Sequence, residues 1–166
     1  MNIGLGISEF FSLATVTTPS LNISLIPAYK KHSAVLAVVM SGKAVVQKGP
    51  GSLQPSIVSG IELDGFSFHY RFAPKYQKRF SPVMGYNFNY IKFTAVVGSE
   101  SLTNYESLLT FGIQYNFFKK ISIIHEIGIG HIYYEHLYPY DYFSLPHKAN
   151  ELSGLMKISL NYLFGK

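Results

Sequence analysis

The sequence predicts an all-β protein, an eight-stranded antiparallel up-and-down transmembrane β-barrel, on three observations. Apolar and polar residues alternate with period two in segment after segment, which is typical of strands with one apolar face. Charged residues make up 14% of the 166 residues, against about 25% in a soluble domain. Short and long connections alternate along the chain, as they do in membrane barrels. The length suits one domain over residues 1–166.

Four segments show the clearest alternation. In residues 65–72, Phe66, Phe68, Tyr70 and Phe72 share one face, and the other face holds Gly, Ser, His and Arg. The same division recurs in residues 80–90, 108–117 and 155–164. Because a strand places alternate side chains on opposite faces, each segment predicts a strand with a bulky apolar face and a small polar face.

The other four strands are predicted from less regular patterns, in residues 3–11, 21–25, 34–40 and 121–130. Residues 34–40 are apolar on both faces, so periodicity does not settle their facing. Asp64 and Gly65 interrupt the alternation before the next strand, which predicts a β-bulge. The predicted total is eight, an even number as in bacterial barrels.

Connection lengths orient the predicted barrel. The short links are residues 30–33, 73–78 and 118–120, and the long ones are 13–20, 41–56, 94–103 and 135–151. Outer-membrane barrels have short periplasmic turns and longer external loops. We therefore expect a bacterial outer-membrane location with both termini periplasmic. No basic and apolar leader is visible, so we expect a mature chain that follows Met1.

The bulky apolar face is expected to meet lipid. The interior of an eight-stranded barrel is just wide enough for side chains, so small polar residues fit there and stacked aromatic rings do not. Tyr and Phe near the strand ends suit an interfacial girdle, although the sequence has no Trp. The alternative is a soluble lipocalin-like barrel, which turns its apolar face inward around a ligand.

The last predicted strand resembles a C-terminal assembly signal that is found in a known family. Residues 156–164 end in the aromatic pair Tyr162 and Phe164 and look like the C-terminal signal read by the outer-membrane assembly machinery, although Gly165 and Lys166 follow. The whole chain resembles the small outer-membrane barrels of the OmpA transmembrane domain and OmpX type, and its residue usage resembles that of Bacteroidota barrels. The resemblance implies a Gram-negative outer membrane, contact with lipopolysaccharide and other outer-membrane lipids, and assembly by that machinery.

Four charged residues lie on the predicted polar faces: Arg71, Glu106, Glu126 and Lys157. An unpaired charge in a filled interior is costly, so we predict an internal network of salt bridges and hydrogen bonds. The filled interior also predicts a plugged barrel that does not conduct solutes. Such a network can be purely structural.

Enzyme chemistry is not expected. His125 and His131 are separated on a strand by about 20 Å, so they cannot share a metal, and their spacing is not that of H-E-x-x-H. The H-x-S arrangement of outer-membrane lipid A deacylases is also missing. We expect no cofactor and no metal, and a lipid A deacylase-like enzyme is the alternative.

Three polar residues lie on outward positions of the predicted strands: Glu9, His125 and His131. Polar side chains are unusual on a lipid face. Either bulges displace them, or this side of the barrel packs against another membrane protein. They form a candidate protein-contact face, and we expect a structural or accessory subunit of a larger outer-membrane complex.

Basic residues gather in the short links: Lys30, Lys31, Lys75, Lys78, Arg79, Lys119 and Lys120. No acidic residue joins them there, and the net charge of the chain is +5. This distribution suits lipid head groups or an acidic partner. Nucleic acid is not expected, because the basic residues sit in separate turns and the aromatic residues belong to the lipid face.

Overall fold

A computed structural model describes residues 2–12, 19–29, 31–41, 43–47, 55–59, 65–75, 78–94, 101–118, 120–137 and 147–164. Its elements are the strands β1 (Asn2–Ser12), β2 (Pro19–Tyr29), β3 (His32–Ser41), β4 (Lys43–Gln47), β5 (Pro55–Ser59), β6 (Phe66–Phe72), β7 (Phe80–Thr94), β8 (Ser101–Phe118), β9 (Ile121–Leu137) and β10 (His147–Phe164). In this part of the chain, no helix is long and apolar enough to cross a membrane. The predicted all-β class is confirmed. Met1 lies outside the described residues.

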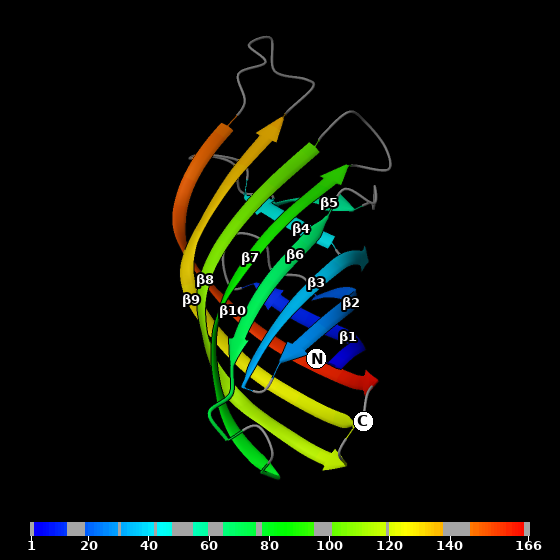
Figure 1. The fold of residues 1–166 in the computed structure, drawn as a ribbon. Coiled ribbons are helices and arrows are strands. Elements are labelled where there is room, and N and C mark those ends of the chain that lie inside the picture. The colour runs from blue at the N-terminus through cyan, green and yellow to red at the C-terminus, as the bar shows by residue number, and fades with distance from the viewer. Residues whose placement is uncertain are drawn as a thin grey trace.

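The main sheet is antiparallel and runs up and down. Its hydrogen-bonded order is β1-β10-β9-β8-β7-β6-β3-β2, and it closes on itself because β1 pairs with both β10 and β2 (Figure 1). A separate hairpin of β4 and β5 begins inside the predicted long connection 41–56 and ends just beyond it, at Ser59. The long connection between β3 and β6 is confirmed, but its hairpin was not predicted, because a run of consecutive apolar residues, Ala44 to Val46, hides the period of two.

Rows of residues that are paired across neighbouring strands spiral around the closed sheet. Stepping from Tyr133 on β9 through the paired residues of β8, β7, β6, β3, β2, β1 and β10 leads back to β9 at Ile123. One circuit therefore shifts the register from residue 133 to residue 123, and such a shear tilts the strands by about 40°. Each residue then advances about 2.5 Å along the axis, and each step to a neighbouring strand about 3 Å.

Each predicted strand coincides with a strand of the main sheet, but β2, β7, β8, β9 and β10 are longer than predicted. The predicted loops 94–103 and 135–151 are correspondingly shorter. In residues 101–107, polar residues occur at both odd and even positions. The alternation on which the sequence prediction depends is lost there, although the backbone continues as a strand.

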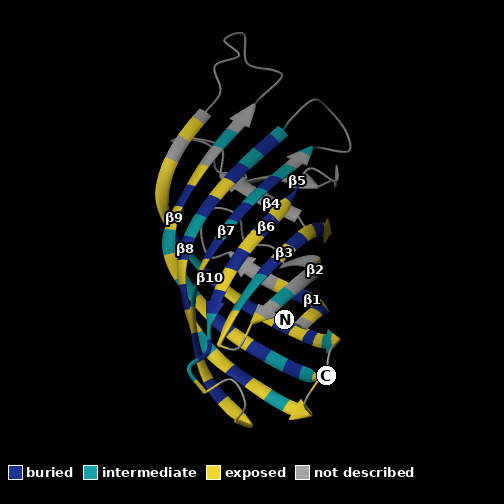
Figure 2. Cartoon of the chain, viewed as in Figure 1, coloured by how far each residue is buried: buried dark blue, intermediate teal, exposed yellow. Residues whose placement is uncertain are grey.

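The alternation of side chains separates an inner face from an outer face (Figure 2). On β6, exposed and buried residues alternate from Phe66 to Arg71. On β3, Leu36 and Val38 are exposed and Val35 and Ala37 are buried, which settles the facing that periodicity left open. Register shifts occur between β2 and β3, where β3 has one extra residue between Val39 and Ser41, and between β8 and β9, where β8 has one extra residue between Asn116 and Phe118. The predicted bulge involves Asp64, which lies outside the described residues.

Candidate functional site

The inner face of the sheet is mainly polar. Among the described residues, 17 buried side chains are polar or charged and 11 are hydrophobic, whereas the large exposed side chains include residues such as Ile127 at 60% and Leu109 at 57%. A soluble protein shows the reverse distribution. The aromatic side chains of Phe66, Phe80 and Tyr162 are also outward, which is opposite to what a lipocalin-like barrel requires.

An ion pair crosses the interior between β6 and β9. Arg71 Nε donates to both carboxylate oxygens of Glu126, at 3.1 and 3.0 Å, and Nη2 donates to Oε2 at 2.5 Å. Nη2 also donates to Ser159 Oγ on β10 at 3.3 Å. Both charged side chains are almost fully buried, at 2% and 0%. A bidentate pair with additional hydrogen bonds is the form in which buried charges are tolerated.

His69 extends this cluster. Its Nε2 lies 3.0 Å from Thr110 Oγ1 and 3.3 Å from Glu126 Oε1, and the ring is fully buried. Its Nδ1 has no hydrogen-bond partner within the described residues. The sequence pattern placed His69 on the same face as Arg71 but gave no reason to single it out. The one sequence signal that could have found it is its position two residues before Arg71, because residues two apart on a strand share a face.

Lys157 and Glu106 complete the set of predicted interior charges. Lys157 is 1% exposed, its backbone pairs with that of Glu126, and its Nζ has no hydrogen-bond partner in the described part of the chain. Glu106 accepts hydrogen bonds from Asn89 Nδ2 at 2.9 Å and from Ser153 Oγ at 3.4 Å. The structure therefore places all four predicted charges inside. Of these, it pairs Arg71 with Glu126, and it holds Glu106 in a separate cluster.

The three outward polar residues are all exposed, and the register separates them into two positions. Glu9 pairs with Ile158, and Ile158 pairs with His125, so these residues share one row across β1, β10 and β9. His131 lies elsewhere, between Leu152 on β10 and Ser107 on β8. No bulge is present at these positions in the register of β1, β9 and β10.

The sequence pattern did not indicate Ser107 as a candidate site residue. It lies directly opposite His131 on the outer face, but its Oγ is hydrogen-bonded to Tyr86 Oη, and no hydrogen bond joins it to His131. Among the described residues, no group of three His, Cys, Asp or Glu side chains is arranged to hold a metal ion.

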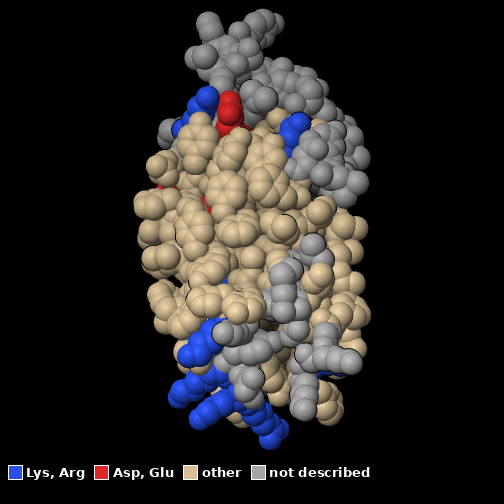
Figure 3. Space-filling model, viewed as in Figure 1, with Lys and Arg blue, Asp and Glu red and all other residues tan. Residues whose placement is uncertain are grey.

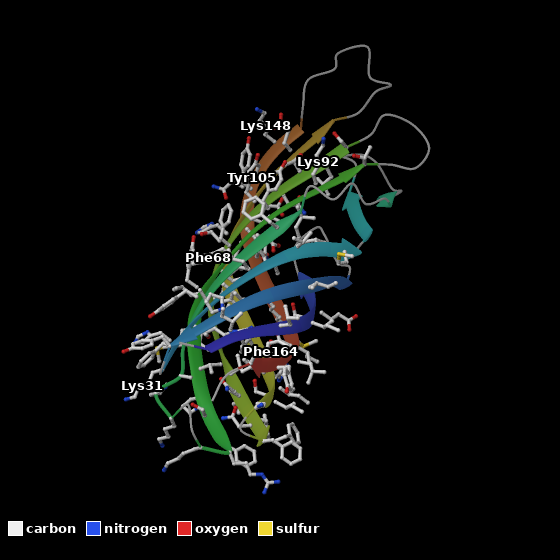
Figure 4. The ribbon with its side chains drawn as sticks, turned by 45° about the vertical axis from the view of Figure 1, so that its right-hand side comes forward. Lys31, Phe68, Lys92, Tyr105, Lys148 and Phe164 are labelled. Carbon is white, nitrogen blue, oxygen red and sulfur yellow. The ribbon has the colours of Figure 1, made fainter. Side chains whose placement is uncertain are left out.

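Basic side chains gather at the end of the barrel that carries the short connections. The described ones are exposed and form the basic rim: Lys31, Lys75, Lys78, Arg79 and Lys120. Figure 3 shows this blue cluster at one end of the molecule, separated by a band of mostly uncharged residues from mixed charges at the other end. In Figure 4, Lys31 and Lys148 mark the two ends, with Phe68 and Tyr105 between them. Lys30 and Lys119 lie outside the described residues.

The terminal aromatic pair faces outward. Tyr162 and Phe164 are 40% and 50% exposed, and their rings pack edge to face with centroids 4.8 Å apart. Residues two apart on a strand share a face. The pair is therefore accessible from the outer surface of β10, where β1 also pairs.

The fold resembles that of solved outer-membrane proteins. Neisserial surface protein A (NspA) matches with a TM-score of 0.56 and 10% identity, over 98% of this chain and 96% of that one. A major outer membrane protein from Thermus thermophilus matches with a TM-score of 0.46 and 10% identity, over 98% of both chains. No protein-family profile and no curated protein matches the chain. The likeness to NspA confirms the fold as that of a small outer-membrane β-barrel protein.

Proposed function

We propose that this chain is an integral protein of the bacterial outer membrane, an eight-stranded transmembrane barrel with a plugged polar interior and no enzymatic activity. The observation that carries the proposal is the inverted distribution of side chains, in which polar residues fill the inside and large apolar residues cover the outside. Such an exterior is stable only in contact with lipid or protein, because water would have to hydrate a continuous apolar band.

The interior contacts support a plug rather than a channel. The Arg71–Glu126 pair joins two separated parts of the wall, and Ser159 accepts a further hydrogen bond from Arg71. His69 Nε2 lies 3.3 Å from Glu126 Oε1 and is hydrogen-bonded to Thr110. The interior of an eight-stranded barrel is filled by side chains. We therefore expect the purified protein to give no steady conductance in a planar lipid bilayer.

The orientation follows from the connections. The ends of β1 and β10 lie at the same end of the sheet as the short links, and short links are periplasmic in outer-membrane barrels. Both termini are then periplasmic, and the basic rim meets the inner-leaflet head groups, where basic residues favour anionic lipids. The other partners in this proposal are lipopolysaccharide, the assembly machinery that reads Tyr162 and Phe164, and a neighbouring membrane protein.

The role we propose is that of a structural or accessory subunit. Glu9 and His125 are exposed on an otherwise apolar surface, and polar side chains in such a position call for a protein neighbour. The test is extraction: the protein should require detergent, migrate faster on gels before heating than after, and bring a partner with it under mild conditions. Release from membranes by carbonate without detergent would overturn the membrane assignment.

A second candidate is a lipid-modifying hydrolase, which the register of Ser107 opposite His131 favours. A serine nucleophile needs a histidine in hydrogen-bond reach and a group that orients the histidine. Here Ser107 bonds to Tyr86 instead. Incubation of lipopolysaccharide or phospholipid with the wild type and with Ser107→Ala tests this candidate. Release of fatty acid that the substitution abolishes would favour the hydrolase over the accessory subunit.

A further inference from the structure

Glu9 and His125 flank Ile158 on the outer surface of the barrel. Glu9 on β1 pairs in register with Ile158 on β10, and Ile158 pairs with His125 on β9. All three side chains are exposed, Ile158 by 48%. Adjacent strands are about 4.8 Å apart, so the two polar residues lie about 10 Å from each other across one isoleucine.

Both polar residues lie at the depth of the apolar band. His125 is four residues from Ile121, the register partner of Tyr162, and eight residues from Tyr133. These separations correspond to about 10 Å and about 20 Å along the barrel axis, and Glu9 lies about 6 Å nearer the Tyr133 end. Since the apolar band of a barrel is about 25 Å tall, neither residue reaches the head groups.

Glu9 and His125 have no partner on this face among the described residues of their own chain. Neither Glu9 nor His125 makes a hydrogen bond or ion pair with another described residue. Their exposed neighbours on these strands are aliphatic, among them Ile7, Leu160 and Ile127. Because polar side chains in hydrocarbon are costly without a partner, the face requires a neighbour that supplies both a group to pair with Glu9 and one to pair with His125.

A second copy of the same face supplies both groups. Two barrels in the same membrane are related by a two-fold axis along the membrane normal, which preserves height and exchanges left and right. When this axis passes beside Ile158, Glu9 of one copy faces His125 of the other, and symmetry forms the pair twice. Glu9 and His125 differ in height by about 6 Å along the barrel axis. The two side chains can span this distance when they extend toward each other.

We infer that the outer face of β1, β10 and β9 is an isologous contact between two copies of this chain, closed by two Glu9–His125 pairs around Ile158. The inference rests on the proposed function, because the pairing requires both copies to lie in one membrane with the same orientation. His131 takes no part in it, since it pairs in register with Leu152 and Ser107 nearer the Tyr133 end.

Cysteine cross-linking in membranes tests the contact directly, because the sequence contains no cysteine. One tagged chain carries Glu9→Cys, a second chain with a different tag carries His125→Cys, and the two are produced together and oxidised. We expect a disulfide-linked species that contains both tags. The matched control is Tyr70→Cys with Leu109→Cys, two exposed residues that flank Tyr86 across β6, β7 and β8 with the same spacing.

Charge exchange gives a second test that does not depend on cysteine. Glu9→His and His125→Glu, each alone, place like groups opposite each other and should lower the dimer association constant in lipid bilayers by roughly tenfold, the effect of one such membrane hydrogen bond. The double variant Glu9→His with His125→Glu should restore it. Photobleaching of labelled chains in bilayers measures the monomer and dimer fractions.

The outcomes separate this inference from the proposed function. Heat-modifiable barrels that show no more cross-linking than the control pair overturn the inference and leave the membrane barrel intact. A linked species that contains a different protein overturns it as well. If the substituted chains do not insert, photobleaching of the wild type decides, because a purely monomeric wild type contradicts the contact. A wild type that never enters the membrane contradicts the proposed function itself.

Discussion

Arg71 on β6 and Glu126 on β9 form an ion pair between strands that are not neighbours in the sheet. β7 and β8 lie between them along the wall, so the pair crosses the interior and ties two parts of the barrel together. Three hydrogen bonds connect the two side chains, and Ser159 adds a fourth contact to the guanidinium from β10. This pair is the centre of the interior network.

Glu126→Gln is expected to destabilise the barrel strongly. The substitution removes the carboxylate that faces Arg71 and lies beside Lys157, and an uncompensated buried charge costs about 3–5 kcal/mol. Guanidinium unfolding in phosphocholine vesicles measures the loss. Glu135→Gln is the matched control, because Glu135 pairs with Lys148 on the exposed surface, where ion pairs contribute little to stability.

Removal of both partners should cost less than removal of one. In the double variant Arg71→Gln with Glu126→Gln, no unpaired arginine is left inside, so part of the loss should be regained. Equal stability of the Glu126→Gln variant and the Glu135→Gln control would contradict the structural role of the interior pair.

Gly112→Ala should disturb the same region by steric overlap. A Cβ at Gly112 would meet the backbone oxygen of His125 and lie 2.8 Å from both Cα and Cγ of Glu126. Backbone atoms in a paired strand cannot give way cheaply, so we expect a loss of about 1–3 kcal/mol. Gly128→Ala is the control, since its nearest contact would be a methyl group of Thr110 at 3.1 Å. A larger loss for Gly128→Ala would contradict this packing.

The surface pair of Lys148 and Glu135 should be visible by titration. The Glu135 carboxylate, 3.4 Å from Nζ, raises the pKa of Lys148 above its ordinary value of 10.5, and Tyr133 adds to the effect. Because the folded pKa is raised, the stabilisation is complete below pH 10.5 and is lost as the pH rises through the raised value. Carbon-13 NMR of the lysine side chain in micelles measures this pKa. Glu135→Gln should return it toward 10.5.

The two ends of the barrel should differ in accessibility from outside the cell. Lys148→Cys, near the long connections, should react with a membrane-impermeant maleimide on intact cells, and Lys75→Cys, in a short link, should react only after the outer membrane is opened. Both positions are exposed, so a difference in labelling reports the side of the membrane. Labelling of position 75 on intact cells would reverse the proposed orientation.

The strands and their facing were predictable where one face is uniformly small and polar. On β6, the sequence alone predicted that Ser67 and Arg71 face inward and that Phe66 and Phe68 face outward, and the burial agrees. Prediction failed in 101–107, where side chains of mixed polarity occupy both faces and only the backbone pairing with β7 and β9 extends the strand. Pairing between strands is a long-range interaction that local periodicity does not contain.

Which side chains meet inside the barrel was less predictable than which side chains face inward. Strand parity identified Arg71 and Glu126 as inward residues, but their meeting depends on the register of four strands and on the shear of the sheet. The same register explains why Glu106 bonds to Asn89 and Ser153 and does not join the other charges. Neither relation follows from spacing along the chain.

The division into two faces also determines where the chain tolerates a change of length. Addition or deletion of one residue inside a strand would turn every later side chain of that strand to the opposite face, so that residues such as Lys157 would enter the lipid. The register shifts in the described strands occur near strand ends, at 39–41 on β3 and 116–118 on β8. Variation in length during evolution, and epitope insertion by design, should therefore be confined to strand ends and connections.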